Sequence, residues 1–398
     1  MMDTLHKSLT IAFLAVSIFI SGLNVDFVGA QNAALEPVTI QLRWFHQFQF
    51  AGYYAAIEKG FYAEEGLQVS LREFEPGKDR IAPILEGKAQ YGVGGPSLLK
   101  IRTEGHPVVV LAQIFQHSPG VLITLKESGI FSPYELVDKK MMLPLDDIGN
   151  APIQSMILAT HGDMNRITVV PHTYDNLDLI NSKVEAMSAY LSNEPFRLKQ
   201  QGMAINIIDP HSYGIDFYED NLFTTEKEIK AHPERVKKMI RATLKGWEYA
   251  LEHRNDIIDL ILTKYNPDLD RDQLRYEAKV IDQMIVPDLV AIGDINPRRY
   301  ERIAETYHRL GMSTASTVPD GFIYQAKPEP VVSLTDEEQA WLKAHPNIQM
   351  RFTGAFEPTL IVNPDGSYRG SLVDILDALN TRLGKERFFE SKSICRGI

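Results

Sequence analysis

The stretch VTIQLRWFHQFQFAGYYAAIEKGFYAEEGLQVSLREF, residues 38–74, decides the fold class. Residues 38–42 read as a strand, residues 52–59 have helical spacing and end at Gly60, and residues 68–74 alternate between apolar and polar. A strand, a helix and a second strand in this order form a βα unit, the building block of parallel sheets. The sequence therefore predicts an α/β fold on a mainly parallel sheet.

The same alternation continues to about residue 206. It predicts helices over residues 78–87 and 96–105, and strands at 90–93, 108–115, 121–125, 141–145, 167–170, 184–190 and 205–208. The loop Gln116-His117-Ser118-Pro119-Gly120 separates two strongly β-prone segments. We expect it to cross between two lobes, the second of which runs from about residue 141 to 209.

A long amphipathic helix is predicted next. It starts at His232-Pro233-Glu234, and the apolar face repeats at three- and four-residue spacing through Val236, Ile240, Thr243, Trp247 and Ala250. Residues 313–330, rich in Ser, Thr and Pro, are typical of a linker. One two-lobed domain is therefore expected over residues 31–330.

Residues 331–398 indicate the start of a second domain. A helix begins at Leu334-Thr335-Asp336-Glu337-Glu338, the turn Asn363-Pro364-Asp365-Gly366 predicts a hairpin, and a helix at 371–383 and a strand near 387–389 follow. Roughly sixty residues of this type are too few to close a sheet, so we expect an incomplete domain of marginal stability.

The first thirty residues have the pattern of a cleaved export signal. His6 and Lys7 precede an apolar run over residues 9–20, and Val28-Gly29-Ala30 supplies small residues for cleavage. The run is shorter than the ~20 residues that span a bilayer. We expect residues 1–30 to be removed and the remainder to reside in the periplasm.

The composition favours a globular protein that binds a small solute. Hydrophobic residues make up 44%, charged residues 23%, and the net charge of −11 leaves no basic stripe for nucleic acid. The single cysteine, Cys395, excludes an internal disulfide or a cysteine-based metal cluster.

Aromatic and amide residues crowd the end of the first strand, where open α/β sheets bind ligands. Trp44 offers a flat face for stacking, and Gln47 and Gln49 can each donate and accept hydrogen bonds. We place these three residues and Tyr53 in the site, and assign Phe45, Phe48 and Phe50 to the core.

Three further segments supply candidates. The turn containing Gly94, Gly95 and Ser97 exposes N–H groups, and a purely structural turn is equally consistent with it. Gln116 and Ser118 lie in the crossover loop, whereas His117, lacking a second histidine at ligand spacing, indicates no metal site. Tyr190, Asn193 and Glu194 are candidates at a strand-to-helix junction. The last candidates are Tyr213 and Asp216 in the loop after residue 209, and the pattern of this loop fits a purely structural role about as well as ligand binding. Glu194 can accept from an exocyclic amine, although a glutamate in a first helical turn is commonly a dipole partner.

At these residues the chain resembles a known family. The motifs are Gln41-Leu42-x-Trp44, Gln49-Phe50-Ala51-Gly52-Tyr53, Glu58-Lys59-Gly60-Phe61-Tyr62, Gln116-His117-Ser118-Pro119 and Asn193-Glu194-Pro195. Across residues 38–262 they resemble the substrate-binding proteins related to thiamine pyrimidine synthase, of the SsuA type. The resemblance implies a type II periplasmic binding fold whose lobes close on a pyrimidine, held by an aromatic residue and a carboxylate. Trp44 and Glu194 match those positions.

Two readings of the resemblance compete with a transport-associated binder. A fungal enzyme of the family forms the thiamine pyrimidine with pyridoxal phosphate and iron and carries a cysteine-rich motif that this chain lacks. No catalytic motif stands out, so we expect no cofactor and keep the synthase as an alternative.

The tail supplies the second alternative. Leu334-Thr335-x-Glu337-Glu338-x-x-Trp341-Leu342 and Pro364-Asp365-Gly366-x-x-x-Gly370 resemble the start of a family 3 solute-binding domain. Such domains precede a histidine kinase or diguanylate cyclase, which implies the truncated sensory region of a signalling protein. The partner is accordingly an ABC permease or a membrane signalling module.

Overall fold

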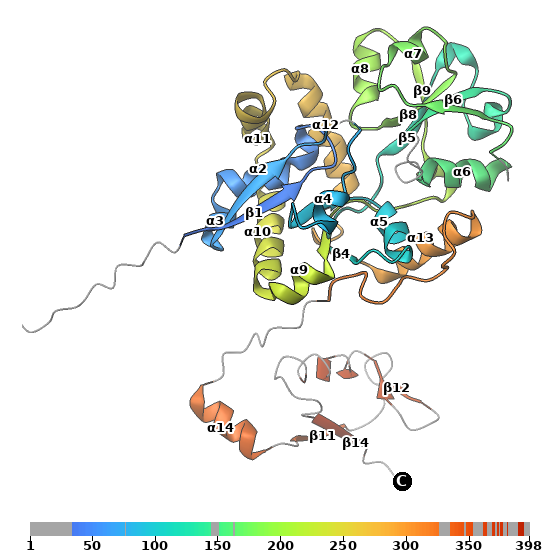
Figure 1. Cartoon of the computed structure of the whole chain (residues 1–398). Helices are drawn as coiled ribbons and strands as arrows, with labels where there is room; N and C mark the ends of the chain where they lie inside the picture. The colour runs from blue at the N-terminus through green and yellow to red at the C-terminus, as the bar shows by residue number, and fades with distance from the viewer. Residues whose placement is uncertain are drawn as a thin grey trace, which may run out of the picture. The chain divides into compact units, whose positions relative to one another are not determined.

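The computed structural model describes residues 34–75, 77–144, 151–161, 164–325 and 335–345, and short stretches between 348 and 393. The chain divides into two units after Tyr324 (Figure 1). The expected export signal, the turn at residues 364–366 and Cys395 lie outside the described residues, so those predictions stay untested.

The first unit contains a sheet of five strands in the order β2-β1-β3-β10-β4. The strands are β1 (Glu36–Gln41), β2 (Leu67–Arg72), β3 (Tyr91–Gly94), β4 (Val108–Phe115) and β10 (Glu219–Thr225). β1 is parallel to β2 and β3, whereas β10 is antiparallel to β3 and β4. The predicted parallel core is confirmed, but the sequence reading missed β10.

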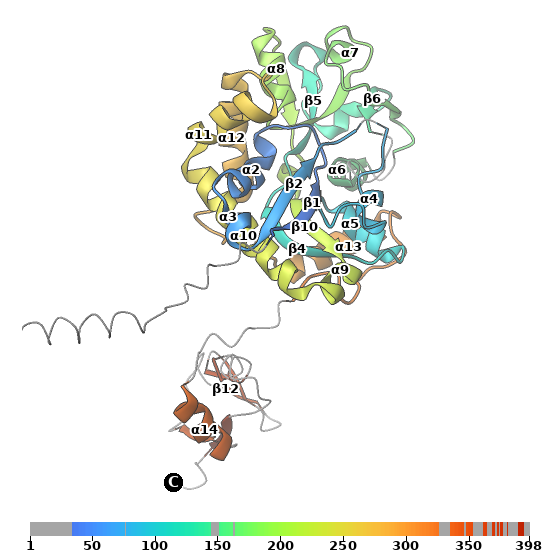
Figure 2. The same cartoon turned by 60° about the vertical axis from the view of Figure 1, so that its left-hand side comes forward.

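A second five-stranded sheet, in the order β7-β6-β8-β5-β9, forms the other lobe (Figure 2). Its strands are β5 (Gly120–Leu125), β6 (Lys140–Leu143), β7 (Thr168–Pro171), β8 (Ala186–Tyr190) and β9 (Ile205–Ile208). Since β4 belongs to the first sheet and β5 to the second, residues 116–119 cross between lobes as predicted. The second lobe therefore begins at β5 rather than near residue 141. Residues 209–218 cross back to β10, and these two segments are called the first and second linkers.

Helices cover both sheets. They are α2 (Ala51–Glu58), α3 (Phe61–Glu64), α4 (Ala82–Leu85), α5 (Ser97–Thr103), α6 (Ala151–His161), α7 (Leu177–Ile180), α8 (Glu194–Gln200), α9 (Glu226–Ala231), α10 (Pro233–Glu252), α11 (Arg254–Leu260), α12 (Arg271–Ile285) and α13 (Pro297–Arg309). Within the described residues, no helix has the length and apolarity needed to cross a membrane.

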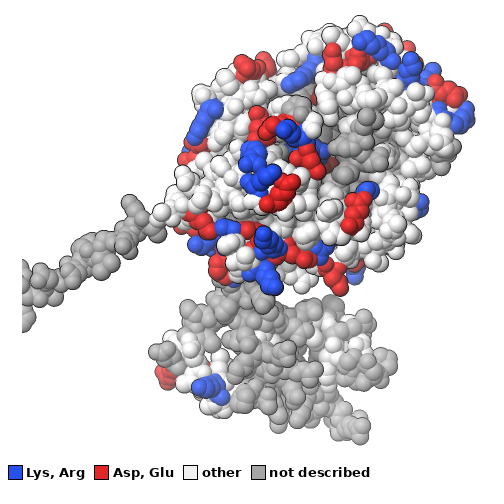
Figure 3. Space-filling view, in the orientation of Figure 1, with Lys and Arg blue, Asp and Glu red and all other residues white. Residues whose placement is uncertain are grey.

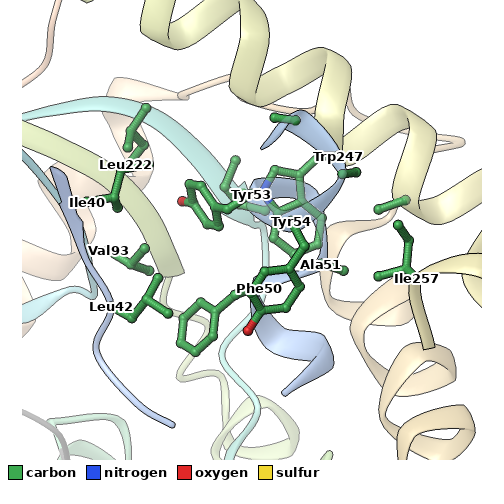
Figure 4. Close-up of a cluster of buried hydrophobic side chains, with 14 of the residues drawn as sticks. Ile40, Leu42, Phe50, Ala51, Tyr53, Tyr54, Val93, Leu222, Trp247 and Ile257 are labelled. Carbon is green, nitrogen blue, oxygen red and sulfur yellow. The ribbon is translucent and has the colours of Figure 1, made fainter. Parts of the chain in front are cut away.

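The predicted long helix α10 packs on α2 through small residues. A Cβ atom on Gly246 would lie 2.7 Å from that of Ala56, so the two backbones approach closely. Trp247 is buried beside Tyr53 and Tyr54 in the core of the first lobe (Figure 4). This packing fixes α2, and with it the segment that joins β1 to α2.

Two local predictions were wrong. The helix expected over residues 78–87 is only the four-residue α4, because the Asp79 carboxylate accepts from the N–H groups of Ile81 and Ala82 and starts the helix late. Phe45, assigned to the core, is 38% exposed because it lies at the rim of the first lobe, edge-on to Trp44.

The second unit contains α14 (Asp336–Ala344), β11 (Ile348–Phe352), β12 (Ile361–Val362), β13 (Tyr368–Arg369) and β14 (Phe389–Ser393). Thr335 and Glu338 form a reciprocal cap at the start of α14. β12 and β13 pair antiparallel, as the predicted hairpin requires, and β11 pairs parallel with β14. That this unit begins a solute-binding domain stays a prediction.

Glu277 of α12 positions a short 3-10 helix, η1 (Phe48–Phe50), directly after β1. Its side chain is buried, and its two oxygens accept the backbone N–H groups of Phe48 at 3.0 Å and Gln49 at 3.2 Å. Those N–H groups lie at a helix start, where no intrahelical acceptor exists. Burial raises the pKa of Glu277 to about 8, against the opposing effect of the two N–H donors.

We expect Glu277 to make the protein less stable as pH rises from about 4.5 to about 8. Across this range the folded state binds a proton that the unfolded state has lost, so stability falls by up to about 1.4 kcal/mol per pH unit. Glu277→Gln cannot ionise. In urea unfolding over this range, the wild type should lose stability relative to the variant. A difference independent of pH would contradict the prediction, and Glu248→Gln on the exposed face of α10 is the matched control.

Candidate functional site

A cavity of about 410 Å³ is lined by residues of both lobes. Its volume falls in the range of small-molecule sites, roughly 300 to 1,000 Å³. Many of its walls are segments that follow strand carboxyl ends, namely Arg43 and Trp44 after β1, Phe74 after β2, His172 and Tyr174 after β7, and Asn193 and Glu194 after β8. This is the edge at which open α/β sheets bind ligands.

Six of the residues proposed from sequence line this cavity. They are Trp44, Gln47, Gln49, Tyr190, Asn193 and Glu194. The reasoning from sequence missed Phe74, His172 and Tyr174, although each also follows the end of a strand. The same positional rule that selected Trp44 would have found them.

Trp44 forms an aromatic wall with partners from both lobes. Phe74 stacks on it with ring centroids 5.2 Å apart and planes at 14°, and Tyr174 reaches it from the second lobe at 5.4 Å and 51°. One face of Trp44 is therefore already covered by Phe74. The contact between Trp44 and Tyr174 is the aromatic contact across the cleft.

His172 is held as a neutral imidazole that supports Tyr174. Its Nδ1 accepts the backbone N–H of Tyr174 at 2.9 Å, so Nε2 carries the proton and donates to the carbonyl oxygen of Ser188 at 2.9 Å. Burial lowers the pKa of His172, in keeping with the neutral form. Both ring nitrogens are thus engaged, and His172 serves to position Tyr174.

An amide relay connects the cavity to a buried carboxylate. Gln49 Nε2 donates to Asp220 Oδ2 at 2.6 Å, and Gln47 Nε2 donates to Gln49 Oε1 at 2.7 Å. Because an ionised carboxylate only accepts, Asp220 fixes the direction of both amides. Gln47 Oε1 is left as an acceptor at the cavity, suited to an N–H group of a ligand.

Asp220 belongs to a buried ionic cluster beneath the relay. Arg43 Nη1 contacts Asp220 Oδ1 at 2.8 Å, also contacts Glu219 and lies 3.4 Å from the hydroxyl of Tyr190 in the second lobe. Burial raises the pKa of Asp220 to about 6, although the positive charge of Arg43 opposes the shift. The cluster ties the two lobes together at the floor of the cavity.

Glu194 is the carboxylate of the second lobe. At the start of α8, its Oε2 accepts the N–H of Tyr190 at 2.7 Å and its Oε1 accepts from Asn193 Nδ2 at 3.1 Å. Burial raises its pKa. Each oxygen can accept a further hydrogen bond, so the position of Glu194 in the first turn of α8, expected for a dipole partner, leaves room for a ligand donor.

The other proposed residues do not line the cavity. Tyr53 is 1% exposed and packs edge-on against Trp247, because it faces α10 rather than the cleft. Tyr213 packs against a separate buried cluster that contains residues of both lobes, and Ser97 starts α5. A Cβ atom on Gly94 would meet Leu98, and one on Gly95 would overlap Glu219, so close packing explains this turn.

The linker residues proposed from sequence also lie outside the cavity. Gln116 and Asp216 both contact Arg299, and Ser118 donates to Glu219 at 3.0 Å. His117, which the sequence reading treated as isolated, lies beside His211 and Asp216, because the two linkers run side by side.

Two curated proteins are similar in sequence to about two thirds of this chain. The formylaminopyrimidine-binding protein of Halalkalibacterium halodurans is 24% identical over 257 residues, covering 64% of this chain and 78% of that protein. The riboflavin-binding protein RibY of Chloroflexus aurantiacus is 25% identical over 264 residues, covering 64% and 74%.

Solved structures show the same fold. The periplasmic aliphatic sulphonate binding protein SsuA of Escherichia coli superposes with a TM-score of 0.58 at 12% identity, over 75% of this chain and 96% of that one. The family described as NMT1/THI5 like matches residues 47–257, which is more than half of the chain. The chain therefore belongs to the NMT1/THI5-like family, as its sequence motifs indicated.

Proposed function

We propose that this chain is an exported binding protein for a planar nitrogen heterocycle with an exocyclic amine, of the aminopyrimidine type. The amide relay carries this proposal, because it presents Gln47 Oε1 as a fixed acceptor beside the flat face of Trp44. Relatives named for formylaminopyrimidine and for riboflavin support a heterocyclic ligand.

Binding works by stabilising the closed arrangement of the lobes. A ligand in the cavity contacts Trp44 and Gln47 of the first lobe and Tyr174 and Glu194 of the second only when both lobes surround it. Its differential affinity for that state shifts the population toward closure. A membrane partner then recognises the closed form.

The periplasm is the proposed location and an ABC permease the proposed partner, with a membrane sensor as the alternative. The structural likeness to a periplasmic binding protein supports this location. Positive and negative side chains are interspersed on the face shown in Figure 3, which suits a small solute better than nucleic acid. The sensor alternative depends on the predicted identity of residues 331–398.

The residues at the cavity do not favour the synthase alternative. Among the described residues that line the cavity, the one histidine is His172, and both of its ring nitrogens already form hydrogen bonds. Lys78 is the one lysine among the described residues that line the cavity, and it is exposed, so it offers no buried amine for pyridoxal phosphate. We therefore assign no reaction step to pyridoxal phosphate or iron.

A thermal-shift screen of the whole chain tests the ligand class. Aminopyrimidines should stabilise the protein by about 2.7 kcal/mol at a concentration a hundredfold above Kd, whereas amino acids should not. Thiamine, flavins, alkanesulfonates, and pyridoxal phosphate with iron complete the screen. If only pyridoxal phosphate stabilises the protein, and a pyrimidine forms after iron is added, the binding-protein proposal is wrong and the synthase alternative is correct.

Gln47→Leu should discriminate between ligands with and without the amine. We expect the variant to lose about 1 to 3 kcal/mol of affinity for a 4-aminopyrimidine, and distinctly less for the analogue with hydrogen in place of the amine. Titration calorimetry of both proteins with both ligands measures the coupling energy between the Gln47 side chain and the amine of the ligand. Equal losses would contradict a contact to Gln47 Oε1, and Gln68→Leu on exposed β2 is the control.

Trp44→Ala and Glu194→Ala should each weaken aminopyrimidine binding by about 1 to 3 kcal/mol, through lost stacking and a lost charged acceptor. Melting temperatures of the free variants separate this effect from unfolding. Phe131→Ala removes an exposed aromatic residue elsewhere in the second lobe and should leave affinity unchanged. Unchanged affinity in both site variants would rule out this cavity as the binding site.

A further inference from the structure

The two linkers bring together three potential metal ligands outside the cavity. His117 lies on the first linker, and His211 and Asp216 lie on the second. His117 Nδ1 is 2.7 Å from Asp216 Oδ1, and the two imidazole rings are 5.4 Å apart at 77°. One ligand atom from each residue lies within 4.8 Å of the others.

These distances are compatible with a single bound cation. Imidazole nitrogens and carboxylate oxygens bind Zn²⁺ at about 2.0 to 2.2 Å, which places neighbouring ligands of a tetrahedron roughly 3.3 Å apart. The His117–Asp216 separation of 2.7 Å is somewhat shorter, and the other ligand atoms lie within 4.8 Å of one another. The His211 side chain is exposed, and its ring nitrogens have no hydrogen-bond partner among the described residues, so its rotation can complete the geometry.

The neighbouring residues orient the carboxylate. Asp216 Oδ2 is held by Arg299 at 3.0 Å, which leaves Oδ1 directed at His117. Arg299 is itself fixed, because it donates to the carbonyl of Gln116 at 2.5 Å and lies over the ring of Tyr218 at 4.1 Å. Outer partners of this kind fix the orientation of metal ligands in proteins.

We propose that His117, His211 and Asp216 form a binding site for a divalent transition-metal ion of the Zn²⁺ class, bridging the two linkers. Two nitrogens and one oxygen leave a fourth position for water, and they favour zinc-like ions over Mg²⁺ or Ca²⁺, which prefer all-oxygen sites. The bound ion stabilises the linker arrangement seen here, in which Trp44 meets Tyr174 across the cleft.

Equilibrium dialysis of the untagged whole chain against Zn²⁺ tests the site, and the absorption spectrum of the Co²⁺-loaded protein reports coordination. We expect one Zn²⁺ per chain, a tetrahedral Co²⁺ spectrum and a melting temperature raised by Zn²⁺. His211→Ala, at an exposed side chain, should abolish all three without loss of fold, and His117→Ala should do the same.

His106→Ala is the matched control, since His106 is exposed and precedes β4, whereas the first linker follows the other end of β4. It should retain the full stoichiometry and spectrum. The proposal is overturned if the wild type binds no stoichiometric Zn²⁺, if His211→Ala binds as the wild type does, or if His106→Ala loses the ion equally. None of these outcomes depends on the heterocycle, so the test stands apart from the proposed function.

Discussion

The contact of Arg43 with Glu219 and Asp220 is the interaction on which the arrangement of the lobes depends. It joins the end of β1 to the start of β10, and the hydroxyl of Tyr190 brings the end of β8 to the same point. Burying an unpaired charge costs several kcal/mol, so neither carboxylate is stable here without the guanidinium. The first linker is tied in as well, because Ser118 donates to Glu219.

This cluster imposes conditions on the surrounding backbone. A side chain at residue 95 would overlap the Glu219 carboxylate, so the glycine-rich turn after β3 is required by packing rather than by an anionic ligand. Asp220 adopts a φ of 45°, a conformation that costs energy for a residue with a side chain. A strained backbone conformation persists where several contacts hold the residue in place, and here Arg43 and Gln49 both form hydrogen bonds with the Asp220 carboxylate.

The sequence predicted those features that depend on local pattern. Alternation of strands and helices located most of both sheets, and the rule that ligands bind at strand ends selected Trp44 and Glu194. The sequence did not predict β10, because this strand starts with two acidic residues, Glu219 and Asp220, which are not typical of a buried strand. Their partner, Arg43, lies far away in the chain, so the local pattern does not contain it. Tyr53 was misplaced for a related reason: which side of α2 faces the cleft is set by the packing of α10, which the local pattern does not contain.

The second linker leads directly into β10, the strand that carries Asp220. Asp216, beside His117 and Arg299, and Asp220, beneath the amide relay, are separated by only a short stretch of the same chain. Asp216 lies on the linker itself, whereas Asp220 belongs to β10 in the sheet of the first lobe. Asp220 determines the direction in which Gln49 and Gln47 present their amides, and all three residues belong to the first lobe. Arg43 contacts both Asp220 and the hydroxyl of Tyr190 in the second lobe, so the polar network that orients the amides also spans the cleft.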